Sequence, residues 1–148
     1  MEYRASVNIW IEVKAMRLLK NLKVTEKEQK EVICNIEAFL NQEKSVLYSY
    51  IYGSFIEGKG FNDIDIAIYV DEESMSEDNL LQCQLELGVK LETLLQKYPI
   101  DCRLLNQAPL SFRFSVITEG ELIFSRNENK RISFETLTRS RYFDFKPH

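Results

Sequence analysis

The segment from Gly53 to Asp65 constrains the fold more than any other part of the chain, because it joins two predicted strands. The run VLYSYIYG, residues 46–53, is apolar and ends at a glycine, as a buried strand often does. The run DIDIAIYV, residues 63–70, begins with strict alternation of charged and apolar residues, which is typical of a strand. A short loop therefore separates two successive strands.

Gly53 and Ser54 open this loop and are candidates for binding a phosphate. A glycine has no side chain, so a ligand can approach its backbone closely. The serine can cap the following turn and leave N–H groups and a hydroxyl directed at a phosphate. A Gly-Ser pair alone is most often only a turn, so the prediction depends on the residues of the next strand.

Asp63 and Asp65 are two residues apart on the second strand, so their side chains leave the same face. Their Cα atoms are about 6.5 Å apart, given the rise per residue of a strand. Asp101 lies in a third predicted strand, IDCRLL, and can supply another carboxylate. Three carboxylates directed at one point repel each other unless cations lie among them. The pattern predicts a site for two Mg²⁺ ions.

Gly53, Gly58 and Lys59 also match the G-x-x-x-x-G-K part of a P-loop. Residue 60 is glycine, however, and not the Ser or Thr that holds magnesium in that motif. Asp63 follows too soon for the helix that a P-loop must open. We therefore reject the P-loop and interpret Lys59 as a solvated loop lysine.

Helical patterns and a further strand surround this segment. Thr25 and Glu28 have the spacing of a capping box before one helix, and Ser76 can cap a second. A third helix is predicted from about residue 109 to 117, followed by the strand LIFS and a helical tail over residues 131–145. The pattern indicates an α+β domain, a small mixed sheet with helices packed on one face.

Composition excludes several chemistries. The 148 residues suit one domain with one core. The only histidine is His148, so a Ser-His-Asp or Cys-His mechanism has no plausible base, and histidine-containing zinc sites are excluded. The net charge of -4 argues against a broad basic surface, so we expect no direct nucleic-acid binding.

The sequence also predicts a cytoplasmic protein with no membrane partner. No apolar run approaches the roughly 20 residues that a membrane-spanning helix needs. The N-terminus carries charges through its apolar stretch, unlike a signal peptide. Cys34, Cys83 and Cys102 include no CxxC pair, so we expect small buried side chains in a reducing compartment.

Residues 1–24 are interpreted as an N-terminal helical extension. Ile9, Val13, Met16 and Leu19 are spaced for a helix with one apolar side. The segment is either a native helix that packs on the body or on a partner, or an extension before an alternative start at Met16. The sequence leaves both interpretations open.

Taken together, these motifs resemble the polymerase-beta-like nucleotidyltransferase superfamily, in which GS is followed by DxD and by a third Asp on a later strand. The small size, IDCRLLNQAP, EGELIFS and the terminal RYFDFKP resemble the minimal nucleotidyltransferases that are paired with HEPN-domain proteins. The resemblance implies a nucleotidyltransferase domain with that fold over residues 25–148. The loop over residues 55–62 is slightly shorter than is usual in the family, which would either narrow the nucleotide pocket or alter the base preference.

The resemblance implies an MntA-like antitoxin of a HEPN/MNT toxin–antitoxin pair. Such proteins transfer AMP from ATP to a tyrosine of a HEPN ribonuclease toxin and so silence it. By position, Gly53 and Ser54 would bind the triphosphate, and Asp63, Asp65 and Asp101 would bind Mg²⁺. Asp101 would be nearest to the attacking hydroxyl.

The sequence leaves several alternatives open. The chain could adenylylate a small molecule such as an aminoglycoside, although it lacks a second domain to hold one, or it could neutralise a toxin by binding alone. Formation of a homo-oligomer is also open. Tyr142, Phe143 and Phe145 in the tail are expected to pack back on the sheet, or alternatively to contact a partner.

Overall fold

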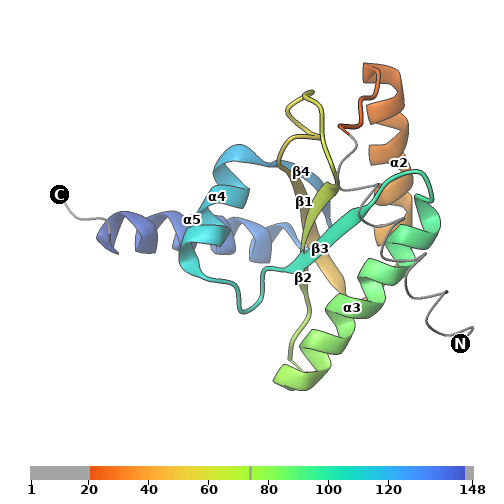
Figure 1. The fold of residues 1–148 in the computed structure, drawn as a ribbon. Helices are drawn as coiled ribbons and strands as arrows, with labels where there is room; N and C mark the ends of the chain where they lie inside the picture. The colour runs from red at the N-terminus through yellow and green to blue at the C-terminus, as the bar shows by residue number, and fades with distance from the viewer. Residues whose placement is uncertain (1–20, 74, 146–148) are drawn as a thin grey trace, which may run out of the picture.

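The computed structural model describes residues 21–73 and 75–145, and its core is a four-stranded sheet with strand order β3-β2-β1-β4. Helices cover both faces of this sheet, α2 and α3 on one side and α4 and α5 on the other (Figure 1). In chain order the described elements are α2 (Glu26–Gln42), β1 (Val46–Tyr52), β2 (Ile64–Val70), α3 (Glu77–Leu94), β3 (Ile100–Leu104), α4 (Leu110–Glu119), β4 (Glu121–Ser125) and α5 (Glu128–Phe145).

The sheet is mixed, as predicted. β1 pairs antiparallel with both β2 and β4, whereas β2 pairs in parallel with β3. Tyr52 at the end of β1 lies opposite Asp65, and Asp65 lies beside Asp101 of β3. Since residues paired across a sheet share a face, these three side chains form a row on one side of it.

Two hydrophobic clusters hold the layers together. Ile51 and Ile66 point to the face covered by α2 and α3, whereas Tyr48 and Tyr50 point to the face covered by α4 and α5. The expectation of helices on one face is therefore wrong. The reason is that β1 is buried at six successive positions, so both of its faces need a covering layer.

Local sequence signals explain where the helices start. The capping box of Thr25 and Glu28 is present at α2, and the Ser76 hydroxyl accepts a hydrogen bond from the Asn79 N–H at α3. Among the described helices, none combines the length and the apolar character that crossing a bilayer requires. The predicted helix within residues 1–20 lies outside the described residues.

The tail is helical, as predicted, but the expectation that its rings pack back on the sheet is wrong, as is the expectation that Cys34 is buried. α5 extends beyond the sheet (Figure 1), and Thr138 is its last buried residue, so the rings after it cannot reach the sheet. Tyr142 stacks instead on Phe114 of α4, with ring centroids 3.7 Å apart. Cys34 is exposed on α2, whereas the other two cysteines are half-buried.

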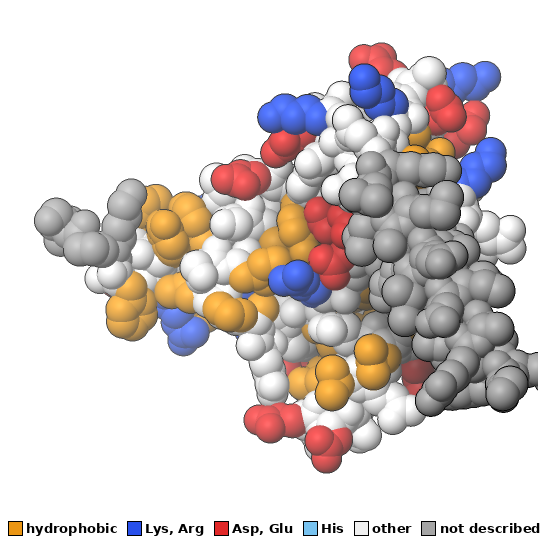
Figure 2. All heavy atoms as spheres, in the orientation of Figure 1, with side chains coloured by type: hydrophobic (Ala, Val, Ile, Leu, Met, Phe, Trp, Pro, Cys, Tyr) orange, Lys and Arg blue, Asp and Glu red, His pale blue; other side chains and the backbone are white. Residues whose placement is uncertain are grey.

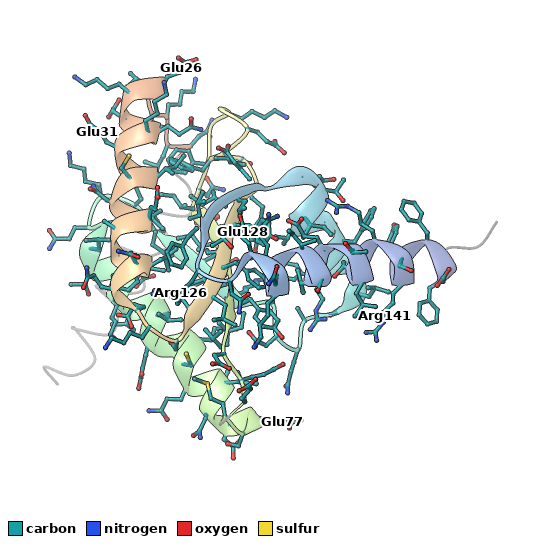
Figure 3. All side chains as sticks on the ribbon, turned by 180° about the vertical axis from the view of Figure 1, so that it is seen from behind. Glu26, Glu31, Glu77, Arg126, Glu128 and Arg141 are labelled. Carbon is teal, nitrogen blue, oxygen red and sulfur yellow. The ribbon has the colours of Figure 1, made fainter. Side chains whose placement is uncertain are left out.

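Arg126 joins three elements at the end of α2. Its guanidinium donates hydrogen bonds to the carbonyl oxygens of Leu40, Asn41 and Val46, at 3.0–3.3 Å. Helix C-termini leave their last carbonyl groups without a partner in the helix, and here the arginine supplies one. Figure 3 shows Arg126 beside the end of α2, and Arg141 far out on α5.

Replacing Arg126 with alanine should therefore destabilise the domain. We expect Arg126→Ala to lower the free energy of unfolding by about 1–3 kcal/mol, the usual cost of losing hydrogen bonds to a charged group. Urea denaturation measures this directly. Arg141→Ala is the matched control, because Arg141 is exposed, and it should change stability by less than about 0.5 kcal/mol. Equal stability of the two variants would contradict the capping role.

Candidate active site

Gly53 sits at the end of β1 in a conformation that only glycine adopts easily. Its φ angle is 84°, in the left-handed region. A Cβ atom at this position would also collide with the carboxylate of Asp65. The glycine therefore lets the Asp65 carboxylate lie directly against the backbone, a reason that the sequence alone did not reveal.

The loop after Gly53 is held at both ends by buried rings. Phe55 and Phe61 pack edge to face, with centroids 5.0 Å apart. The Gln29 side chain of α2 donates a hydrogen bond to the Phe55 carbonyl oxygen at 2.9 Å, and Leu22 pairs with Phe61 through two backbone hydrogen bonds. Ser54 is exposed at the start of this fixed loop.

The loop does not open a helix, so the rejection of the P-loop is confirmed. Residues 54–63 form turns and a single bridge before β2 begins. The Lys59 side chain is 73% exposed and lies 3.4 Å from the Glu57 carboxylate. It is a solvated loop lysine, as expected.

The three predicted aspartates come together. Asp63 directly precedes β2, and the parallel register places Asp65 beside Asp101. One carboxylate oxygen from each of the three lies within 4.8 Å of the other two, and all three residues are half-buried. The fold thus gathers these side chains into one cluster, with Asp65 against Gly53.

The electrostatics of this cluster favour a bound cation. Burial, together with the negative charges of Asp63 and Asp101, raises the pKa of Asp65 to about 7. Such a shift means that the third negative charge is costly without compensation. Three carboxylates at this spacing form the all-oxygen donor set that Mg²⁺ prefers, so the residues fit a divalent metal.

The sequence analysis missed two residues that border the cluster. Burial raises the pKa of Tyr52, and the charge of Asp65 adds to the effect, so its phenol stays neutral. The Arg103 guanidinium lies 3.4 Å from the Asp101 carboxylate. The available signal was spacing, because Arg103 follows Asp101 by two positions on the same strand and must share its face. Figure 2 shows acidic side chains gathered near the middle of this face, with a basic side chain next to them.

The raised pKa of Asp65 predicts how stability without metal depends on pH. The ordinary pKa of an aspartate is 3.8, and the pKa in the folded protein is about 7. Between these values the folded protein holds more protons than the unfolded chain, so its stability falls as pH rises. We expect the free energy of unfolding in EDTA to decrease from pH 5 to pH 8.

Asp65→Asn should remove most of this decrease and should be more stable than the wild type at pH 8 without metal. Asp144→Asn, which removes an exposed carboxylate near the end of α5, is the matched control and should keep the wild-type dependence. If the free energy of unfolding of Asp65→Asn depended on pH as it does in the wild type, the Asp65 carboxylate would not be the cause of that dependence.

Several solved structures that share this fold are of toxin–antitoxin proteins. A crystal structure of a toxin–antitoxin with AMP-PNP has a TM-score of 0.60 and 23% sequence identity, and the match covers 76% of this chain and 87% of that chain. A tri-AMPylated Shewanella oneidensis HEPN toxin in complex with MNT antitoxin gives a TM-score of 0.59 and 22% identity over 78% and 87% of the chains. No curated protein sequence matches this chain.

A family model provides the assignment. The model described as polymerase beta, nucleotidyltransferase matches residues 34–129. This range contains both strands that flank the Gly-Ser loop and all three aspartates of the cluster. The chain therefore belongs to the polymerase beta nucleotidyltransferase family.

Proposed function

We propose that this protein transfers AMP from ATP to a tyrosine of a HEPN-domain ribonuclease toxin and acts as its antitoxin. The observation that carries the proposal is the convergence of Asp63, Asp65 and Asp101 beside a fixed Gly-Ser loop. In support, the structures with the same fold include one with AMP-PNP and one with a tri-AMPylated HEPN toxin.

Each side chain has a role that follows from its position. Gly53 and Ser54 would bind the triphosphate, because the loop presents its backbone without a side chain in the way. Asp63, Asp65 and Asp101 would hold two Mg²⁺ ions. When bound, these ions neutralise the triphosphate and stabilise the charge that develops on the leaving pyrophosphate.

The reaction itself is an in-line displacement. The oxygen of the acceptor hydroxyl attacks the α-phosphorus of ATP, and its proton passes to the Asp101 carboxylate. The bond from the α-phosphorus to the bridging oxygen breaks, so that pyrophosphate leaves and AMP remains joined to the acceptor through a phosphodiester. Asp101 suits the role of proton acceptor because it lies on the edge strand, where the hydroxyl of the second substrate can reach it.

Labelled ATP tests this function. The protein is incubated with [α-³²P]ATP, Mg²⁺ and the HEPN-domain protein encoded beside it, and we expect label on a tyrosine of that protein. Asp63→Asn and Asp65→Asn should abolish the transfer while the fold persists, because each removes a metal ligand and no core contact.

Circular dichroism controls for the fold of both variants, and Glu37→Gln, which neutralises an exposed carboxylate on α2, is the matched variant that should keep full activity. Toxin neutralisation without label would favour an antitoxin that acts by binding alone. Label on an added aminoglycoside and not on the toxin would favour small-molecule adenylylation. A normal rate in either active-site variant would contradict the assigned roles.

The outer half of α5 is the proposed contact surface for the toxin. Phe143 and Phe145 are 54% and 78% exposed, and Arg139 and Arg141 lie on the same projecting half (Figure 3). Exposed aromatic and arginine side chains are enriched where proteins bind each other. The structural neighbours are complexes of an antitoxin with its toxin, which supports a partner here.

Removing both exposed rings should weaken toxin binding without harming the fold. We expect the double variant Phe143→Ala/Phe145→Ala to raise the Kd at least about tenfold, the effect of losing roughly 1.4 kcal/mol at an interface. Isothermal titration calorimetry measures the Kd, and thermal melting controls for stability. Leu85→Ala on α3, where the side chain is 61% exposed, is the control for general loss of apolar surface. Equal binding by the two variants would exclude α5 as the interface.

A further inference from the structure

A groove runs along the outer edge of β3, where no described strand pairs with it, between α3 and α4. It has a volume of about 460 Å³. Asp101 and Arg103 of β3 line it, and apolar side chains line it from both sides, among them Leu80 and Leu81 of α3 and Phe112 of α4. The groove is therefore lined by apolar and polar side chains, and its charged residues are Asp101, Arg103 and Glu77.

The groove reaches Asp101 from the side away from the Gly-Ser loop. Strand order places β2 between β3 and β1, and Gly53 follows β1. Of the three clustered aspartates, the groove is lined by Asp101 alone, and neither Gly53 nor Ser54 lines it. Asp101 thus belongs both to the aspartate cluster beside the Gly-Ser loop and to this groove, which can receive a second substrate.

Arg103 is placed to act on any group that enters this groove. Its guanidinium lies 3.4 Å from the Asp101 carboxylate and 5.7 Å from the centre of the Phe112 ring. The side chain is 56% exposed, and its described ion pair is with Asp101, so the fold gains little from it. A cation beside the proposed proton acceptor can stabilise the negative charge on an oxygen that is losing its proton.

We propose that this groove is the acceptor site and that Arg103 selects a phenolic hydroxyl over an aliphatic one. The inference rests on the proposed function and adds how the tyrosine is recognised. The apolar walls suit an aromatic ring, and Phe112 together with the Arg103 guanidinium can stack on it. A serine or threonine would bring its hydroxyl without filling the groove.

The proton balance explains the need for a cation. As the phenol oxygen attacks the α-phosphorus, its proton moves to Asp101 and negative charge builds on the oxygen before the new P–O bond is complete. Arg103 donates an N–H to that oxygen and stabilises this charge. After the pyrophosphate has left, Asp101 releases its proton to solvent, and Arg103 pairs again with the carboxylate. Arg103 thus binds the acceptor and is not needed to bind the nucleotide.

The test separates binding of the two substrates. For Arg103→Ala, we expect kcat/KM for the HEPN-domain protein to fall at least about tenfold, the effect of losing one charged hydrogen bond. The Kd for Mg²⁺–ATP, measured by calorimetry, should not rise. Arg103→Lys, which keeps the charge, should recover part of the loss. Lys90→Ala on α3 removes another exposed cation and should match the wild type.

A second measurement addresses the choice of hydroxyl. The labelled tyrosine of the toxin is replaced by serine, and the wild type should label the serine form far more slowly, whereas Arg103→Ala should narrow this difference. Unchanged kcat/KM in Arg103→Ala, or a parallel loss of ATP binding, would overturn the inference while leaving the proposed function intact. A wild-type protein that transfers no label to any tyrosine would instead overturn the proposed function and this inference with it.

Discussion

The parallel pairing of β2 with β3 is the constraint on which the site depends. Asp65 and Asp101 are 36 residues apart in the chain, and only this register places them side by side. A slip of one residue would turn every side chain of β3 to the opposite face and would send Asp101 into the layer beneath α3. The crossover helix α3 packs on β3 through buried leucines. It therefore fixes the position of Asp101 as well as the fold.

The same arrangement stores an electrostatic cost. Three carboxylates within 4.8 Å of one another are unfavourable, and the pKa of Asp65 is raised first by burial and then by the charges of Asp63 and Asp101. The aspartates stay close together because several contacts hold the residues around them in place. Gly53 gives the Asp65 carboxylate its space, and Gln29 with the two buried phenylalanines fixes the loop beside it. The stability of the core thus keeps an arrangement that would otherwise relax.

The sequence predicted the parts of the site that follow from local pattern. An apolar run that ends at a glycine located the first strand, and alternation located the second. The two-residue spacing of Asp63 and Asp65 correctly placed their side chains on one face. It did not reveal that α4 and α5 cover the second face, because a continuously apolar strand carries no sign of which element covers each side. Nor could it show the groove beside Arg103, since that space is formed by α3 and α4, which are adjacent only in the folded chain.

The position of β3 at the edge of the sheet has a consequence for how such a protein can change over time. None of the described strands lies outside β3, and the Leu104 N–H is satisfied there by the Gln84 side chain and not by a neighbouring backbone. Residues that border the edge groove can therefore be exchanged without breaking a ladder of backbone hydrogen bonds. The nucleotide half, built on the Gly-Ser loop that joins β1 to β2, has less freedom, because a side chain at Gly53 would collide with Asp65. The nucleotide half of the site can therefore change little in sequence, whereas the acceptor half can change to fit new partners.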